Sequence, residues 1–253
     1  MTLSSLQKVY KILDVFGAAA TELRVTDISR QAGLDKSTVS RILASLSSAG
    51  YLEKNESSKA YSLSWKWLKL GNAVMGRYVD IRVAAVPFLD ELAKQTDEIV
   101  HLAVLDKTEV VSLEKRGRSR ALTIGTQVGG RAPAHASSLG KMLISDMTEE
   151  ELLATFGRTP LVRLTNKTIT NMTDLLKEMR KVKKQGFAFD DGECHEGVQC
   201  LAAPVKDSSG RIIAAISVIV PKQRMSRTKR EEIRVLALQT AESISQRICM
   251  KPF

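Results

Sequence analysis

The residues between positions 190 and 200 form a dense group of side chains that can bind metals, transfer protons or attack an electrophile. They are Asp190, Asp191, Glu193, Cys194, His195, Glu196 and Cys200. A zinc site is one interpretation, but the cysteines and the histidine lack the CxxC or HxxxH spacing of zinc ligands. A catalytic cysteine–histidine pair is another, but the block has no nucleophile elbow and no strong third partner. Neither chemistry therefore follows from the spacing alone.

A second block, PAHASSLGKML, could hold a small acid. Ser137 or Ser138 stands where an extended segment gives way to a helix. The backbone N–H groups of Ser138, Leu139 and Gly140 would then be free to face a carboxylate, and the two hydroxyls add further donors. The alternative is a serine that simply caps the helix.

Alternating helices and strands must position these two blocks. Apolar, β-branched runs predict strands at residues 99–105, 110–113, 201–205 and 212–220. Helical periodicity predicts helices at residues 80–95, 137–145, 149–156, 172–185 and 229–249. The order of these elements predicts a mixed α/β domain with a largely antiparallel sheet.

The first 50 residues have the pattern of a helix-turn-helix. The apolar stripe of residues 4–16 predicts a helix that Gly17 ends. Thr26 is expected to cap a short second helix that stops at Gly33, and Asp35 a third helix over residues 36–49. Two helices joined at a glycine in this way are typical of the motif.

A hairpin and a long helix follow. The segment YLEKNESSKAYSL predicts two short strands around a polar turn, which is the wing of a winged helix-turn-helix. Residues 64–78 resume helical spacing and are interpreted as a linker helix. Its apolar residues, including Trp65, Trp67 and Leu68, exceed what an isolated helix can bury, so we expect an oligomer.

The third helix has the composition of a recognition helix. Short hydroxyls can contact phosphates or base edges, and Arg41 can bind guanine through two hydrogen bonds. The alternative is a helix face that is merely solvated. This alternative is less favoured because the face belongs to a complete unit of helix, turn, helix and hairpin at a chain end. The expected DNA-binding residues are Thr26, Lys36, Ser37, Thr38, Ser40 and Arg41 on the helices and Lys54 and Lys59 on the wing.

Composition narrows the class of protein. The net charge of +10 suits a nucleic-acid partner, but the excess is spread along the chain: residues 1–80 hold 11 Lys/Arg against 7 Asp/Glu, which leaves 27 against 21 for the rest. Three cysteines cannot build a disulfide framework, and no apolar run is long enough to span a bilayer. We therefore expect a cytoplasmic protein without a membrane partner.

At this point the sequence resembles the IclR family, named for the isocitrate lyase regulator. The matching stretches in the small domain are QKVYKILDVF, VTDISRQAGLDKSTVSRILASLSSAGYLEK and YSLSWKWLKLG. In the large domain they are GRAPAHASSLGKMLIS, KKQGFAFDDGECHEGVQCLAAPVKDSSGRIIAAISV and the C-terminal helix. Together they cover the chain nearly end to end, and their order and spacing make the resemblance specific.

The resemblance implies an α+β protein of two domains. A winged helix-turn-helix DNA-binding domain would occupy residues 1–63, a linker helix residues 64–79, and a GAF-like effector-binding and oligomerisation domain residues 80–253. It also implies a homodimer or homotetramer that binds double-stranded, pseudo-palindromic operator DNA as a repressor or an activator. A small organic acid would be the effector, and no cofactor or metal is expected.

The family resemblance also supplies a third interpretation of the two polar blocks, as walls of one effector pocket. Asp190 would accept a hydrogen bond from a ligand hydroxyl. The expected effector-binding residues are Ala121, Ile124, Ala132, Ser137, Ser138, Leu139, Gly140, Asp190, Val198, Cys200, Ser217 and Ile219. The chain departs from the family pattern at Gly192, where an acidic residue is common, and at Ser138 and Leu139, which are bulkier than the smallest variants. These departures leave the shape of the pocket open.

Two other classes of function compete with an effector-responsive regulator. An enzyme with an accessory nucleic-acid domain would need a phosphate loop, metal-ligand spacing or a nucleophile motif, and the sequence has none of these. An unliganded scaffold would have a closed core where the pocket is expected. The regulator remains the leading hypothesis.

Overall fold

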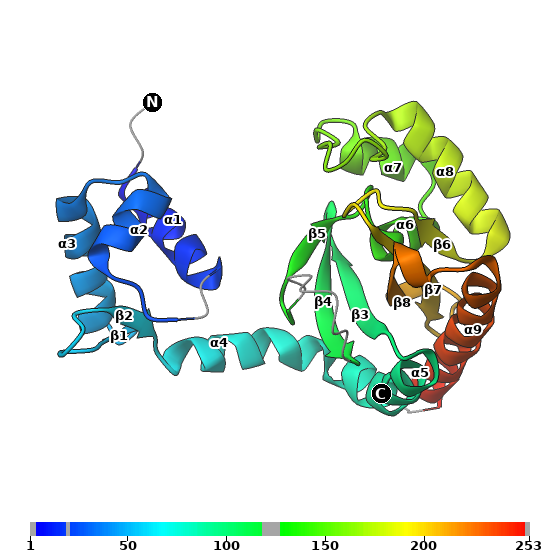
Figure 1. Cartoon of the computed structure of the whole chain (residues 1–253), viewed down its shortest axis with the longest axis horizontal. Coiled ribbons are helices and arrows are strands. Elements are labelled where there is room, and N and C mark those ends of the chain that lie inside the picture. The colour runs from blue at the N-terminus through cyan, green and yellow to red at the C-terminus, as the bar shows by residue number, and fades with distance from the viewer. Residues whose placement is uncertain (1–3, 19–20, 118–126, 251–253) are drawn as a thin grey trace. The chain divides into compact units, whose positions relative to one another are not determined.

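The chain divides into two compact units. The computed structural model describes residues 4–18, 21–117 and 127–250. Residues 1–77 make up the first unit and residues 78–253 the second (Figure 1).

The first unit is a winged helix-turn-helix. Its helices are α1 (Ser5–Ala18), α2 (Val25–Ala32) and α3 (Lys36–Ser48), and the wing is the antiparallel pair β1 (Leu52–Lys54) and β2 (Tyr61–Leu63). The apolar stripes of the three helices meet in one core around Ile12, Ile28, Val39 and Leu43, all of which are fully buried. Such burial on one face of each helix is what the 3.6-residue period predicts.

Local side-chain chemistry fixes the ends of these helices. Asp35 caps α3, because its Oδ1 accepts the backbone N–H of Thr38 at 2.8 Å. Gly33 ends α2 in the left-handed region at φ 64°, which glycine adopts without strain. Two predicted boundaries are wrong. Helix α2 begins at Val25 instead of being capped by Thr26, because the backbone of Leu23 pairs with Tyr61 and directs the chain into the helix from Arg24.

The second wrong boundary is the end of α1, which continues through Gly17 to Ala18. Gly17 is not in the positive-φ region here, so it does not stop the helix. A glycine permits a helix end but does not impose one.

Helix α4 (Lys66–Met75) and the 3₁₀ turn η1 (Gly76–Tyr78) lead out of the wing. The start of α4 is tied to the wing base, because Trp67 Nε1 donates to the carbonyl of Tyr51 at 2.8 Å and the two rings are in contact. The rest of the helix buries no residue of its own, and 80% of Trp65 is exposed. The apolar face that the sequence predicts is therefore uncovered.

The second unit is built on a six-stranded sheet in the order β5-β4-β3-β8-β7-β6, in which every neighbouring pair is antiparallel. Its strands are β3 (Ile99–Asp106), β4 (Glu109–Arg116), β5 (Arg131–Pro133), β6 (Ala188–Asp190), β7 (Val198–Lys206) and β8 (Ile212–Pro221). The mainly antiparallel sheet confirms the predicted fold class. The short strands β5 and β6 were not predicted, since three residues are too few to show a period.

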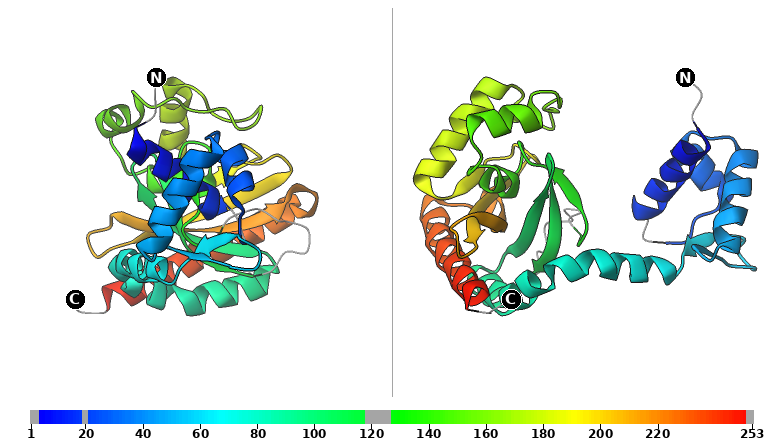
Figure 2. Two further views of the ribbon diagram at one scale, coloured as in Figure 1. Left: turned by 90° about the vertical axis from the view of Figure 1, so that its left-hand side faces the viewer. Right: turned by 180° about the vertical axis from the view of Figure 1, so that it is seen from behind.

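Helices cover both faces of this sheet. The long helices α5 (Val79–Thr96) and α9 (Arg227–Cys249) pack side by side on one face, as Figure 2 shows from behind. The other helices are α6 (Ser138–Leu143), α7 (Glu149–Phe156) and α8 (Met172–Gln185), and a 3₁₀ turn, η2 (Lys222–Arg224), precedes α9. All six residues of α6 are buried between the sheet and α8. Among the described residues, no helix is long and apolar enough to cross a membrane.

Candidate functional site

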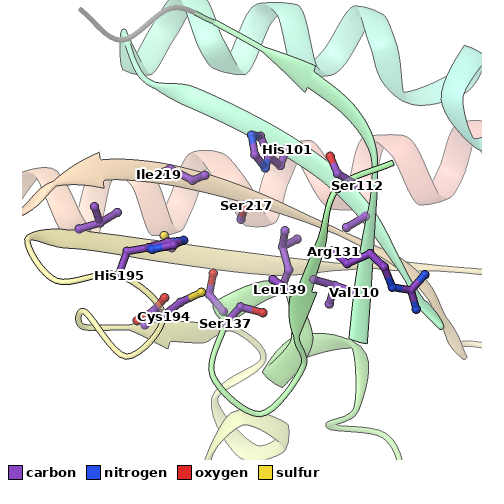
Figure 3. A pocket seen from close by; sticks show the side chains of 17 residues that line it. His101, Val110, Ser112, Arg131, Ser137, Leu139, Cys194, His195, Ser217 and Ile219 are labelled. Carbon is purple, nitrogen blue, oxygen red and sulfur yellow. The ribbon is translucent and has the colours of Figure 1, made fainter. Parts of the chain in front are cut away.

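A cavity of about 240 Å³ lies inside the second unit, between the sheet and the start of α6. Its wall combines apolar side chains with hydroxyl, thiol, imidazole and carboxyl groups. The lining residues are His101, Ala103, Val110, Ser112, Gly130, Arg131, Ala132, Ser137, Ser138, Leu139, Asp190, Cys194, His195, Val198, Cys200, Ser217 and Ile219. Figure 3 shows His101 and Ser112 on one side of this cavity and Ser137 and Cys194 on the other.

The structure brings most of the predicted effector-binding residues together around this one cavity. They are Ala132, Ser137, Ser138, Leu139, Asp190, Val198, Cys200, Ser217 and Ile219. Ala121 and Ile124 lie outside the described residues. Gly140 does not line the cavity, so its predicted place in the wall is wrong.

The start of α6 explains why Gly140 is absent from the wall. Ser137 caps the helix, and its Oγ accepts the backbone N–H of Gly140 at 3.1 Å. That N–H group is therefore not free for a ligand. A Cβ on Gly140 would lie 2.2 Å from Cα of Ala134, so the position needs glycine for close backbone packing.

Sequence reasoning missed the part of the wall that β3 and β4 provide. His101 pairs with Ser217 in the β3–β8 register, which brings a residue from early in the domain beside one that was predicted. His101 and Ser112 each interrupt an apolar strand with a polar side chain, in the runs IVHLAVL and VVSL. That interruption was the available signal. Ala103, Val110, Gly130 and Arg131 were also not predicted, and Cys194 and His195 belong to the polar block that the sequence singled out but were not among the expected effector-binding residues.

Burial shifts the pKa values of two ionisable groups in the wall toward their neutral forms. Burial raises the pKa of Asp190 to about 7, although its Oδ1 accepts the backbone N–H of Glu193 at 2.6 Å. Burial lowers the pKa of His101 to about 4, and the charge of Lys115 adds to this effect. An imidazole with so low a pKa is neutral under physiological conditions.

Burial favours the protonated thiol form of the two cysteines in the wall. Burial, together with the charges of Asp190 and Glu193, raises the pKa of Cys194 to about 12. Burial also raises the pKa of Cys200 well above its ordinary value. Because the thiolate is the nucleophile and the metal ligand, this environment argues against both the catalytic and the zinc interpretation. No group of three or more His, Cys, Asp or Glu side chains in the described residues is arranged to hold a metal ion.

Two cations lie near the cavity, and carboxylates hold both. Arg131 donates to Asp106 at 2.6 Å and to Glu109 at 2.7 Å, and Figure 3 shows its guanidinium pointing away from the cavity. Lys141, behind the wall, is fully buried; its Nζ contacts Glu193 at 2.5 Å and Glu178 at 3.3 Å.

The predicted DNA-binding residues lie on the first unit with different exposures. Lys36, Ser40 and Arg41 are exposed on α3, and Thr26 is exposed in the first turn of α2. Thr38 is not exposed as expected: the residue is 8% exposed, and its side chain hydrogen-bonds the carboxylate of Asp35.

Three other predicted contacts already have protein partners. The Ser37 hydroxyl donates to Asp35 at 2.6 Å, which holds the pKa of that carboxyl well below its ordinary value. On the wing, the amines of Lys54 and Lys59 contact Glu56 at 3.2 Å and 2.9 Å. These exposed ion pairs are weak and can exchange for phosphate.

A winged helix-turn-helix followed by a domain with an internal, ligand-sized cavity defines a DNA-binding regulator that responds to a small molecule. Comparison with known proteins agrees. Residues 5–56 match the IclR helix-turn-helix domain, and residues 74–246 match the C-terminal domain of bacterial transcriptional regulators of the IclR type. The chain therefore belongs to the IclR family, and it is a transcriptional regulator, not an enzyme.

Individual relatives support this assignment along most of the chain. The HTH-type transcriptional regulator XynR of Escherichia coli is 36% identical over 85% of this chain and 85% of its own length. The crystal structure of the Thermotoga maritima IclR protein has a TM-score of 0.78 at 26% identity, covering 96% of this chain and 98% of that one. An IclR homologue from Microbacterium hydrocarbonoxydans, solved in complex with 4-hydroxybenzoate, has a TM-score of 0.77 at 27% identity, covering 97% and 99%.

Proposed function

We propose that a small carboxylic acid, bound in the cavity of the second unit, controls the binding of this regulator to its operator. The cavity's residues named above, from all six strands of the sheet, the start of α6 and the loop after β6, would form the effector site. A volume of about 240 Å³ is small among ligand pockets, which usually measure about 300–1,000 Å³. The effector is therefore a small molecule.

One observation carries this proposal. Ser112 Oγ is buried, lines the cavity and has no hydrogen-bond partner within the described part of the chain. A buried polar group without a partner costs free energy. A ligand oxygen that accepts a hydrogen bond from the Ser112 hydroxyl would therefore stabilise the protein. Apolar side chains such as Val198 and Ile219 would cover the body of the ligand.

The relative solved with 4-hydroxybenzoate supports an aromatic or similarly small acid. That ligand carries a carboxylate at one end and a hydroxyl at the other. The cavity of this chain likewise has polar groups on opposite sides, with Ser112 on the β4 side and Ser137 at the start of α6.

Helix α6 offers a route from the effector to the DNA-binding unit. Its first residues, Ser138 and Leu139, line the cavity, whereas its last residue, Leu143, lines a groove together with Met147 and Tyr78. Tyr78 ends the 3₁₀ turn η1, which joins α4 to α5 in the chain. A shift of α6 on ligand binding would therefore act on the segment that connects the two units.

The regulator would bind double-stranded operator DNA through α3 and the wing, in the compartment where the bacterial chromosome lies, which is the cytoplasm. Arg41, Ser40 and Lys36 are the exposed residues of α3 best placed for base or phosphate contacts. The uncovered apolar face of α4 would pair with a second copy, which gives a homodimer or, by further pairing, a homotetramer.

The proposal is tested with operator fragments that the full-length protein selects from random-sequence DNA. Small carboxylates that raise its melting temperature are then added to a titration of DNA affinity. An effector that binds the two arrangements of the regulator unequally should change operator affinity by about 5- to 150-fold.

Two serine variants make the test specific to the cavity. Ser112→Ala should weaken the response to the acid, whereas Ser243→Ala, which removes an exposed hydroxyl on α9, should leave it unchanged. If acids bind without altering operator affinity, or if Ser112→Ala responds like the wild type, the cavity is not the control site.

A further inference from the structure

The carboxyl of Asp190 creates an electrostatic problem for an acidic effector. Asp190 ends β6 in the wall of the cavity and is 2% exposed. The loop that follows brings Glu193 beside it, with the Glu193 N–H bonded to Asp190 Oδ1 at 2.6 Å. A bound carboxylate would therefore be placed next to existing negative charge.

The nearby cations offset only part of this charge, although the charge of Lys141 does lower the pKa of Asp190. Lys141 of α6 holds the carbonyl of Phe189 at 2.6 Å and the carboxylates of Glu193 and Glu178, so one positive charge already faces two negative ones. Among the described residues that line the cavity, Arg131 carries the permanent positive charge, and Asp106 and Glu109 hold its guanidinium.

The other strands and the loop add neutral groups toward Asp190. β7 contributes Cys200 and the loop contributes Cys194, and both thiols have raised pKa values. β3 contributes His101, whose pKa is lowered to about 4, and β8 contributes the Ser217 hydroxyl. His195 is exposed at the rim, and burial raises the pKa of Glu193 beside Asp190, so both groups must be controlled for in any pH experiment.

Two carboxylates at one site cannot both ionise without a large penalty, and the usual solution is that the pair retains one proton. We propose that a carboxylate effector enters this cavity together with one proton, which it shares with Asp190. The inference rests on the proposed function. On binding, the ionised carboxylate of Asp190, the carboxylate of the effector and one proton from solvent form a complex in which the two carboxylates share that proton through a hydrogen bond. No other bond changes.

The linkage has a definite direction. The pKa of Asp190 is about 7 in the free protein, so below that pH the proton is already present and affinity for the carboxylate changes little. Above it, each pH unit should weaken binding by about tenfold, because the proton must be taken up on binding. From about pH 6 to about pH 8.5 the expected loss is roughly 10- to 30-fold.

The experiment uses the full-length protein and titration calorimetry with four probes, namely acetate, butyrate, benzoate and 4-hydroxybenzoate, and their four carboxamides. The binding of each probe is measured at about pH 6 and about pH 8.5. Each measurement is made in two buffers of different ionisation enthalpy, because the difference in binding enthalpy between the buffers gives the number of protons taken up. Carboxylates that bind should take up about one proton at the higher pH and weaken as stated. The neutral carboxamides should show neither effect.

Two variants identify the titrating group. Asp190→Asn should abolish the proton uptake and flatten the pH dependence, and His195→Gln should retain both. The wild-type proton count stands by itself if Asp190→Asn fails to fold.

Three outcomes would overturn the inference. If carboxylates bind equally tightly at both pH values and take up no proton, the inference of a shared proton is wrong. Loss of the pH dependence in His195→Gln assigns it to the imidazole. If none of the carboxylates binds at either pH, the proposed function is wrong as well. That result differs from binding that is independent of pH, which contradicts the shared proton alone.

Discussion

The amine of Lys141 lies 2.5 Å from a carboxylate oxygen of Glu193 in the interior of the second unit. The same amine contacts the carbonyl of Phe189 and the carboxylate of Glu178, so one buried lysine joins α6, β6, α8 and the loop after β6. Of these elements, α6, β6 and the loop after β6 form one side of the cavity. The lysine therefore holds the wall of the effector site from behind.

Replacing this lysine should destabilise the second unit strongly. Lys141→Met leaves the Glu193 carboxylate without its cation, and removing one partner of a buried ion pair costs about 3–5 kcal/mol. Lys181→Met is the matched control, because Lys181 contacts the same Glu178 from the surface and such exposed pairs contribute about 1 kcal/mol or less. Denaturant unfolding gives the free energy of unfolding of each variant. It is followed by circular dichroism because both tryptophans lie in the first unit, so their fluorescence does not report on the second unit. Equal effects of the two substitutions would contradict the proposed role of the buried amine.

Asp190 should make stability depend on pH. Its folded-state pKa of about 7 is raised from 3.8, so the folded protein binds the proton more tightly, and stability falls as pH rises between these values. Asp190→Asn removes this loss and should gain on the wild type by up to a few kcal/mol at pH 8 relative to pH 5.

Asp191→Asn provides a control of opposite sign. The Lys167 amine, 2.5 Å away, lowers the pKa of Asp191, so that carboxylate stabilises the fold when ionised, and this contribution is lost at acidic pH. Its replacement should therefore cost slightly more at neutral than at acidic pH. If both aspartate variants show the same trend, burial is not the cause of the Asp190 effect.

Two glycine substitutions should act in opposite directions. Gly140→Ala places a Cβ 2.2 Å from Cα of Ala134, where only backbone movement can relieve the clash, so we expect a loss of about 1–3 kcal/mol or more. Gly71→Ala lies inside α4 with open space around it and should stabilise the first unit by about 0.5–1 kcal/mol. Thermal unfolding, with tryptophan fluorescence for the first unit and circular dichroism for the second, separates the two. A tolerated Gly140→Ala would show that α6 can shift freely.

Arg41 and Lys59 should contribute differently to DNA binding. Arg41→Ala should weaken binding to the selected operator by about 1–3 kcal/mol if it contacts a base, with little effect on scrambled DNA. Lys59→Ala should weaken both by a similar factor, because a phosphate contact carries no sequence information. Gel-shift titrations on the two DNAs measure this. Equal losses on both DNAs for Arg41→Ala would make it a phosphate contact.

The uncovered face of α4 should drive self-association without DNA. Trp65, Leu68 and Val74 are exposed by 80%, 53% and 56%, more apolar surface than one helix usually leaves in water. Sedimentation at micromolar concentration should show a dimer or tetramer, and Leu68→Ser should shift it toward the monomer. Lys69→Ser, a polar change on the same helix, should not. A wild-type monomer of 27.8 kDa at that concentration would end this prediction.

Much of the fold could be predicted because its determinants are local. Asp35 caps α3 through the N–H three residues on, and Gly33 ends α2, and both follow from residue type alone. The ranges of α7 and α8 follow in the same way from their periodicity. Where local signals failed, as at Thr26 and Gly17, a contact distant in sequence or an optional glycine conformation decided the boundary.

The sequence by itself determined which elements form, in what order, and the family to which they belong. The tertiary structure decided which side chains meet. Strand register places His101 beside Ser217, close packing against Ala134 takes Gly140 out of the wall, and the position of α6 buries Lys141 among carboxylates. The residue type of Lys141 or Thr38 does not indicate burial, because the free-energy cost of burying a polar side chain depends on the partners that the fold supplies. The charge state of Asp190 depends on burial in the same way, and so it follows from the assembled domain and not from the order of its residues.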